Sequence, residues 1–389
     1  TPMMLRRHLA VIAWVCLFAG CGIIPLRGEQ NNLLEEDEHR LWLTVEAEEQ
    51  RLDQSGLLLT DQAVNDYLNS VLRQLSPPES TPDILTVEVR VLKNPLLNAF
   101  AFPNGKIYIH TGLLARIENE AQLATLLGHE LTHATHRHTI QELRGVRRGS
   151  AVLATLQMIV LPLGVLGSVA TSLGAVGYMG AVSGYSQGKE LEADEEGLGL
   201  MVKAGYSPRE ATKLFEHLKE ELVFRKVDEP FFFGSHPRVQ ERIDSYHHLI
   251  ETKYAGQRGE EGVDRYNAVI SPLVIDNAET DLAIGRLALV LRDLERLVSR
   301  QSDNARAHFL LGEVFRQRKE PGDAERSDSH YNRAIEANPR LPEPHRSLGY
   351  SFLKRGDRQS AMAELRKYLE LAPHAPDRAY VEQAIKESL

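Results

Sequence analysis

The residues best suited to chemistry form the run HELTH, residues 129–133. Two histidines four positions apart on a helix lie about 40° apart, so both rings can reach one tetrahedral ion. Glu130 lies about 100° from His129, where its carboxylate can hydrogen-bond a water on the metal without binding the metal. A metal acidifies such a water, and a neighbouring carboxylate accepts the proton. The run therefore predicts a hydrolytic metal site, with His129 and His133 as ligands and Glu130 as general base.

The third ligand is expected from a later part of the chain. The helix that carries HELTH is predicted to extend from about residue 119 to residue 139, because apolar residues repeat there at helical spacing. On such a helix His136 lies roughly 10 Å along the axis from His129, too far to share an ion. His138 is predicted to face elsewhere. The extended pattern HExxHxxGxxH also fails, because His136 and Thr139 stand at its glycine and histidine positions.

The acidic run ELEAD, residues 190–194, is the best source of that ligand. Glu190 and Asp194 lie on one helical face, so one can bind the metal while the other hydrogen-bonds a ligand histidine. Glu192 competes for the role but points away from that pair. The alternative is an acidic helix start with favourable dipole contacts.

The elements that must position these residues are mostly helices. Helical spacing covers residues 35–75, and helices resume after residue 192. Between them, residues 85–92 alternate as a strand, and a turn at 103–106 joins two further short strands. The sequence therefore predicts a predominantly α-helical α+β domain, with a small sheet just before the metal helix.

One apolar stretch leaves two alternatives open. No charged residue lies between Arg148 and Lys189, which is long enough for a membrane span. A single crossing would place His129 and Glu190 on opposite sides of the bilayer. Residues 150–188 therefore form either buried helices and a loop, or a re-entrant or interfacial segment that contacts the membrane beside the site.

The C-terminal part contains two copies of one pattern, and residues 308–315 align with residues 345–352. The second copy resembles the tetratricopeptide repeat at the following positions: Leu348, Gly349, Phe352, Ala361, Leu365 and Pro373. Each copy is a helix pair that must stack on a neighbour to bury its apolar face. Such arrays commonly bind peptides or partner proteins, although a purely structural role is the alternative.

Several motifs together resemble the Ste-type zinc peptidases, a family that includes the CAAX prenyl protease and BepA-like envelope proteases. They are HExxH at 129–133, ExxxD at 190–194, Asn-Ala-Phe at 98–100, and Ser-His-Pro at 235–237 followed by Arg242. The resemblance implies a gluzincin-like domain that holds one Zn²⁺ per chain. It also covers the C-terminal repeats, because BepA-like members carry them.

The resemblance also implies roles for individual residues. The metal ligands are His129, His133 and Glu190, the base is Glu130, and Asp194 hydrogen-bonds a ligand. The run Asn98, Ala99 and Phe100 forms an edge strand that receives the substrate backbone. His236 is either a reversible fourth ligand that silences the site or a donor on the oxyanion side. Arg242 braces that region.

The N-terminus is typical of a secretory signal, with a short basic segment before an apolar run of about ten residues. Its end, LFAGC, resembles the lipobox of bacterial lipoproteins, which implies cleavage before Cys21 and acylation of its thiol. Gly22 favours the outer membrane as destination; a simple cleaved signal is the alternative. The expected organisation is as follows: signal 1–20, tether 21–34, peptidase domain 35–253, linker 254–275 and repeat domain 276–389.

The predicted function is a zinc endopeptidase on the periplasmic side of the bacterial envelope. Its substrates would be misfolded or stalled envelope proteins, the repeats would recruit substrates or assembly partners, and lipidated Cys21 would tether it to the membrane. The net charge of −9 provides no basic surplus for nucleic acid. Two other hypotheses are a repeat-based chaperone or scaffold with a silenced site, and a peptidase acting on lipid-linked substrates through residues 150–188.

Overall fold

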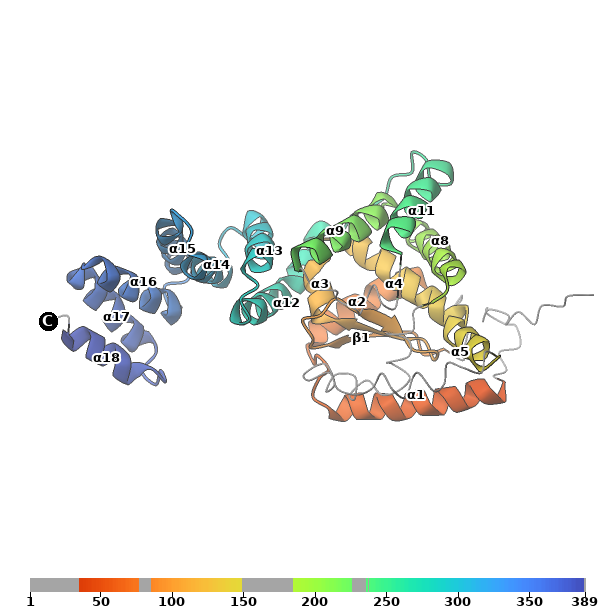
Figure 1. Ribbon diagram of the computed structural model, residues 1–389, viewed down its shortest axis with the longest axis horizontal. Helices are drawn as coiled ribbons and strands as arrows, with labels where there is room; N and C mark the ends of the chain where they lie inside the picture. Colours follow the sequence, from red (N-terminus) through yellow and green to blue (C-terminus); the bar gives the residue numbers. More distant parts are fainter. Residues whose placement is uncertain (1–34, 77–84, 149–184, 226–235, 237, 388–389) are drawn as a thin grey trace, which may run out of the picture.

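The computed structural model describes residues 35–76, 85–148, 185–225, 236 and 238–387. The predicted signal, Cys21, the tether and most of the stretch 150–188 lie outside the described residues. Figure 1 shows two lobes side by side along the long axis, one with a sheet wrapped by helices and one made of stacked helices. Together they confirm the predicted class, a mostly helical domain with a small sheet followed by helical repeats.

The elements of the first lobe are α1 (Glu36–Gln54), α2 (Gln62–Leu75), β1 (Glu88–Leu92), β2 (Ala99–Ala101), β3 (Lys106–His110), α3 (Thr111–Arg116), α4 (Glu120–Thr135), α5 (His138–Arg148), α8 (Gln187–Lys203), α9 (Arg209–Arg225) and α11 (Val239–Thr252). Those of the second lobe are α12 (Val263–Ala283), α13 (Leu287–Arg300), α14 (Ala305–Arg318), α15 (Asp323–Ala337), α16 (Pro342–Arg355), α17 (Arg358–Leu371) and α18 (Arg378–Glu387).

The sheet has the strand order β1-β3-β2, so β2 is an edge strand. β1 and β3 pair in parallel, whereas β2 and β3 form the predicted antiparallel hairpin. Gly105 takes φ 96° in its turn, a left-handed conformation that glycine adopts without a Cβ clash. Phe100 and Tyr108 lie opposite each other in the register, and their stacked rings have centroids 5.4 Å apart.

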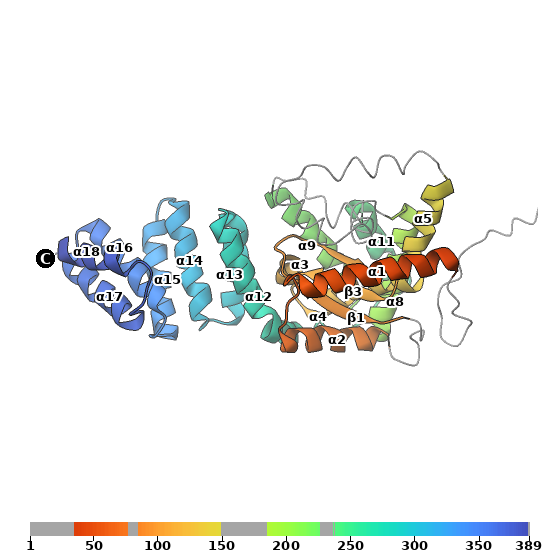
Figure 2. The same cartoon turned by 90° about the horizontal axis from the view of Figure 1, so that it is seen from below.

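Helices cover both faces of the sheet, because its side chains alternate between two apolar clusters. Ala99 and Ala101 join the cluster that contains α2 and α4, whereas Phe100 and Phe102 join the cluster that contains α1. Figure 2 shows α1 crossing in front of the strands. Leu43 on α1 is 52% exposed, because α1 contacts the sheet along one stripe only.

The predicted helix 119–139 is two helices. α4 ends at Thr135, Arg137 adopts the left-handed φ of 59°, and α5 begins at His138. The Arg137 guanidinium stabilises this break by donating from Nε to Glu38 Oε1 of α1 at 2.7 Å. The helix therefore breaks shortly after the HELTH run, and this break sets the position of His138 at the site.

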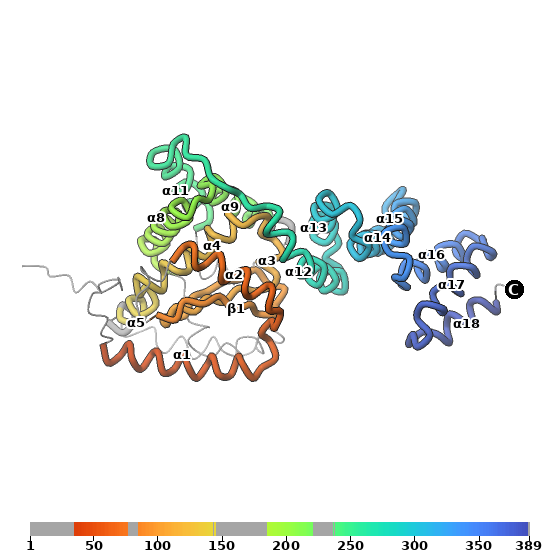
Figure 3. Tube along the Cα trace, turned by 180° about the vertical axis from the view of Figure 1, so that it is seen from behind, coloured from red at the N-terminus to blue at the C-terminus, as the bar shows by residue number. Residues whose placement is uncertain are grey.

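The predicted linker 254–275 is helical from Val263 onward, because α12 begins there. Tyr266 and Ile270 are buried at helical spacing, which explains why the segment folds as a helix. The Tyr266 hydroxyl donates to the Leu114 carbonyl of α3 at 2.6 Å. Residues 254–262 form the connection, which crosses the back of the first lobe in Figure 3. It is anchored to α4 where the Ala121 N–H donates to Glu261 O at 3.0 Å.

A buried ion pair joins the two lobes. Arg116 at the end of α3 is 1% exposed, and it lies 2.7 Å from Asp281 of α12 and 2.5 Å from Asp293 of α13. The last turn of α12 and the middle of α13 are therefore fixed to α3, which precedes the metal helix.

The helix pairs α14–α15 and α16–α17 are the two predicted repeats. Gly312 and Gly349 occupy equivalent positions in them, where a Cβ would lie 2.3 Å from Tyr331 and 2.6 Å from Leu365. Glycine at these positions lets each pair close tightly. Across both lobes, none of the described helices has the length and apolar character needed to span a membrane.

Candidate metal centre

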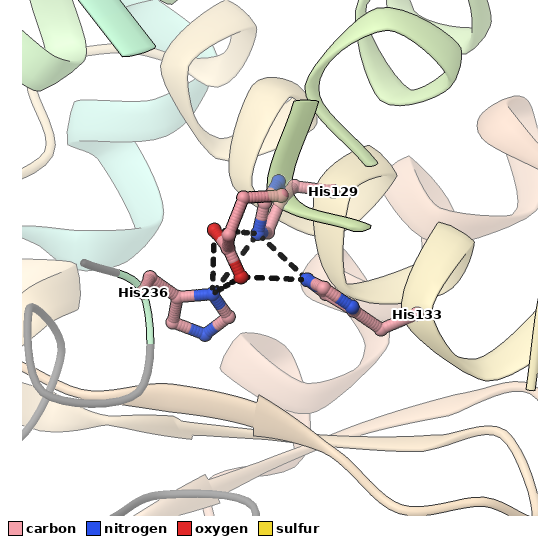
Figure 4. Close-up of side chains that lie close together, drawn as sticks. His129, His133 and His236 are labelled. Carbon is pink, nitrogen blue, oxygen red and sulfur yellow. Dashed lines mark hydrogen bonds and ion pairs between the residues drawn. The ribbon is translucent and has the colours of Figure 1, made fainter. Parts of the chain in front are cut away.

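Four side chains converge at the centre of the first lobe. His129 and His133 come from α4, Glu190 comes from α8, and His236 precedes α11. Their candidate ligand atoms all lie within 4.8 Å of one another, and all four residues are buried. Figure 4 shows the three imidazole rings turned toward one point. The structure thus brings together the three ligands expected from the sequence and His236, which the family resemblance placed near them.

The spacing of these atoms fits a tetrahedral zinc site. Nε2 of His129 lies 3.0 Å from Nε2 of His133 and 3.1 Å from Nδ1 of His236. Glu190 Oε1 lies 3.1 Å from His236 Nδ1 and 3.5 Å from His133 Nε2. Ligands about 2.05 Å from a tetrahedral ion are separated by about 3.3 Å. Three imidazole nitrogens and one carboxylate oxygen are also a donor set that Zn²⁺ accepts.

Two glycines let α4 and α8 approach closely enough to share this site. A Cβ on Gly197 would lie 2.7 Å from the backbone N of His129, and a Cβ on Gly128 would lie 2.8 Å from the carbonyl oxygen of Gly197. The helix backbones therefore touch directly beside His129 and about two turns from Glu190. Any larger residue at either position would separate His129 and Glu190.

Asp194 orients the first histidine. Its Oδ1 accepts hydrogen bonds from His129 Nδ1 at 2.9 Å, Tyr246 OH at 2.7 Å and Arg242 Nη2 at 2.6 Å. Burial opposes its ionisation, but the Arg242 charge and the His129 hydrogen bond hold the pKa of Asp194 well below its usual range. Arg242 also reaches Glu190 Oε2 at 3.2 Å. Arg242 thus forms a buried ion pair with Asp194 and Glu190.

Glu130 lies beside the cluster, and its carboxylate is shielded from solvent. It is 1% exposed, and neither oxygen has a hydrogen-bond partner within the described part of the chain. His236 Nε2 is nearby, 3.3 Å from Oε1. A carboxylate buried beside the candidate ligands is within reach of a water or substrate group at the site.

His236 lies between two carboxylates. Its Nδ1 faces Glu190 and its Nε2 faces Glu130. Burial opposes protonation, yet these two negative charges raise the pKa of His236 to about 9. Burial also disfavours the Glu190 carboxylate, but the charges of His236 and Arg242 outweigh this and lower the Glu190 pKa.

His138 is in a position that the sequence did not predict. Its Nδ1 lies 2.9 Å from His133 Nδ1, and its Nε2 lies 3.2 Å from Glu192 Oε2. The expectation that His138 faces elsewhere was wrong, because it assumed a continuous helix. Arg137, a non-glycine residue in the left-handed region, carries no sequence signal for the break. Tyr185 was also missed; it stacks on His133 at 3.8 Å.

The proposed substrate strand lies on the edge of the sheet. Ala99 and Phe100 are buried in β2, and β2 packs against α4. Asn98, just before β2, is 0% exposed, and its side-chain amide has no hydrogen-bond partner in the residues described. Cys21 lies outside those residues.

Comparison with known proteins assigns the first lobe to a peptidase family. Residues 62–250 match the family model of peptidase family M48, and residues 275–328 and 322–376 match the tetratricopeptide repeat. The first lobe is an M48 peptidase domain. Every residue of the metal centre lies inside the matched range, from His129 to His236. The M48 domain is followed by tetratricopeptide repeats, as the sequence predicted.

Relatives share this domain across wide evolutionary distance. The chain is 28% identical over 204 residues to the β-barrel assembly-enhancing protease of Escherichia coli K12, covering 49% of this chain and 39% of the relative. It is 36% identical over 131 residues to the mitochondrial metalloendopeptidase OMA1 of Arabidopsis thaliana, covering 34% of this chain and 25% of the relative. The OMA1 protein of Schizosaccharomyces pombe is 29% identical over 178 residues, covering 46% of this chain and 50% of the relative. The chain thus spans half or less of the length of these relatives.

Proposed function

We propose that this protein is a zinc-dependent endopeptidase of the bacterial envelope that hydrolyses misfolded or stalled envelope proteins. The observation that carries the proposal is the cluster itself. The ligand atoms of His129, His133, Glu190 and His236 lie within 4.8 Å of one another, and the buried carboxylate of Glu130 lies beside them. The M48 match over the same residues supports it.

The residues divide the chemistry among themselves. Zinc held by His129, His133 and Glu190 would supply Lewis acidity for a carbonyl and a water molecule. Glu130 accepts the proton of the attacking water and delivers it to the leaving amine. Asp194 keeps a proton on His129 Nδ1, so that Nε2 is free to bind the metal.

The edge strand β2 would bind the substrate. An extended peptide laid beside an edge strand gains main-chain hydrogen bonds. The buried and unpartnered amide of Asn98 supports this role, because an Asn side chain offers both a donor and an acceptor to a peptide backbone.

Location and partners are part of the proposal. The lipobox-like end of the signal supports a lipid anchor at Cys21 and an outer-membrane position facing the periplasm. The E. coli relative is named for β-barrel assembly, which supports envelope proteins as substrates or as partners of the repeats.

One observation favours a second function. His236 contributes Nδ1 to the ligand cluster, 3.1 Å from His129 Nε2. A histidine in this place would occupy the position that a substrate carbonyl or water needs. In that state the repeats would act as a chaperone or assembly scaffold while the peptidase stays silent.

Two substitutions test these proposals. Glu130→Gln is expected to retain one zinc per chain and to abolish casein hydrolysis, since it removes the base but no ligand. His236→Ala is expected to retain zinc and to raise hydrolysis. Retention of full proteolysis by Glu130→Gln would refute the assignment of the base. If Glu130→Gln also protects the envelope as well as the unsubstituted chain, the scaffold function is the main one.

A further inference from the structure

The two histidines of HELTH are held by different partners behind their rings. Nδ1 of His129 lies 2.9 Å from the Asp194 carboxylate. Nδ1 of His133 instead lies 2.9 Å from Nδ1 of His138, whose Nε2 lies 3.2 Å from Glu192 Oε2. His133 and His138 are both buried, whereas the Glu192 side chain is 49% exposed. A chain of contacts therefore leads from the metal centre to the surface.

Only one arrangement of protons satisfies these contacts when His133 binds a metal. Its Nε2 faces the cluster and must be unprotonated to be a ligand, so its Nδ1 carries the proton. His138 Nδ1 must then accept that hydrogen bond. The remaining proton of neutral His138 lies on Nε2, which donates to Glu192. The carboxylate thus selects the tautomer of His138, and His138 selects that of His133.

We propose that His138, oriented by Glu192, is the positioning residue for the zinc ligand His133. It fixes the ring's rotation and keeps Nε2 free for the metal, as Asp194 does for His129. This inference rests on the proposed metal site. It adds two residues that act on zinc affinity without touching the metal or the substrate.

The local backbone supports this role. His138 is the first residue of α5, and it contacts His133 of α4 because the helix is broken at Arg137, which has φ 59°. Arg137 is anchored to Glu38 at 2.7 Å. On another side of His133, Tyr185 stacks on the ring with an interplanar angle of 14°. The ring is therefore restrained both in its plane and across its face.

Zinc affinity of the full chain tests the proposal. Competition with a chromophoric chelator gives the dissociation constant for Zn²⁺ of each variant. His138→Ala is expected to weaken binding about 10- to 100-fold, the usual effect of losing such a partner. Glu192→Gln should cause a smaller loss, because an amide oxygen still accepts from Nε2. His138→Gln should recover part of the affinity lost in His138→Ala, since its side-chain oxygen can accept from His133.

His136→Ala is the matched control. His136 Nε2 lies 3.8 Å from the same Glu192 carboxylate, but His136 makes no ligand contact among those described, so its loss should leave zinc affinity unchanged. Unchanged affinity in His138→Ala would overturn the proposal. It would also be overturned by equal losses in His138→Gln and His138→Ala, or by a matching loss in His136→Ala. If the unsubstituted protein bound no stoichiometric zinc, the proposed metal site would fail as well.

Discussion

The contact between α4 and α8 gives a sharp prediction, because a single methyl group there should disturb the metal centre. In Gly197→Ala the new Cβ would lie 2.7 Å from His129 N and 2.8 Å from the carbonyl carbon of Gly128. Carbon atoms pack at about 3.5–4.0 Å, so the helices must separate by roughly 0.5–1 Å. Both close atoms are backbone, and no side chain can rotate away to make room.

The stability lost through this overpacking can be isolated with a control substitution on the same helix. In Gly199→Ala the nearest atom to the new Cβ is the Tyr254 hydroxyl at 3.4 Å, an ordinary contact. Each substitution replaces a helical glycine with alanine, and this should add about 1 kcal/mol to the free energy of unfolding. The two variants should therefore differ by the overpacking cost alone, about 1–3 kcal/mol in the free energy of unfolding, with Gly199→Ala the more stable.

The same displacement should reach the ligands. Glu190 on α8 lies 3.5 Å from His133 Nε2 on α4, and metal–ligand distances tolerate changes of only about 0.2 Å. Zinc affinity should fall in Gly197→Ala and stay unchanged in Gly199→Ala. Urea unfolding of the metal-free proteins and zinc competition would measure both effects. Equal stability and equal zinc affinity in the two variants would refute this account of the helix contact.

Three further predictions follow from buried charges. Asp194→Asn leaves Arg242 without its main partner and should lower the free energy of unfolding by about 3–5 kcal/mol. The double change Asp194→Leu with Arg242→Met should cost less stability than the sum of the two single changes. Strict additivity of the losses, measured by urea unfolding, would contradict this. Burial lowers the pKa of His110 to about 4, below its unfolded value of 6.5, so the stabilising neutral form is fully present above pH 6.5 and about 3 kcal/mol is lost as the pH falls to about 4. His110→Leu should flatten that part of the stability–pH profile, and an unchanged slope would count against it. Arg116→Met should remove the buried ion pairs with Asp281 and Asp293 and speed proteolytic separation of the two lobes; unchanged cleavage rates would argue that these ion pairs do not hold the lobes together.

Most of the fold was predictable because local patterns carried it. The turn at 103–106 between two β-rich runs indicated the hairpin, and Gly105 indeed takes φ 96° there. The repeat pattern around Leu348 and Gly349 indicated the helix pairs. The segment predicted as a linker is helical from Val263 onward, and its apolar residues become buried only when α12 packs against α3 and α13.

The sequence by itself determined the chemistry on each helix. The spacing of His129, Glu130 and His133 specifies two ligands and a base on one α-helix, and the spacing of Glu190 and Asp194 specifies a second acidic face. These inferences needed only the 3.6-residue period, which any helix imposes on its side chains.

Only the tertiary structure decided how those faces meet. The approach of α4 and α8 depends on Gly128 and Gly197 lying opposite each other, far apart in sequence. The place of His138 depends on Arg137 leaving the helical conformation, which the contact with Glu38 on α1 stabilises. Helical periodicity is a local property, whereas backbone contacts and an arginine in the left-handed region depend on neighbours that only the folded chain provides.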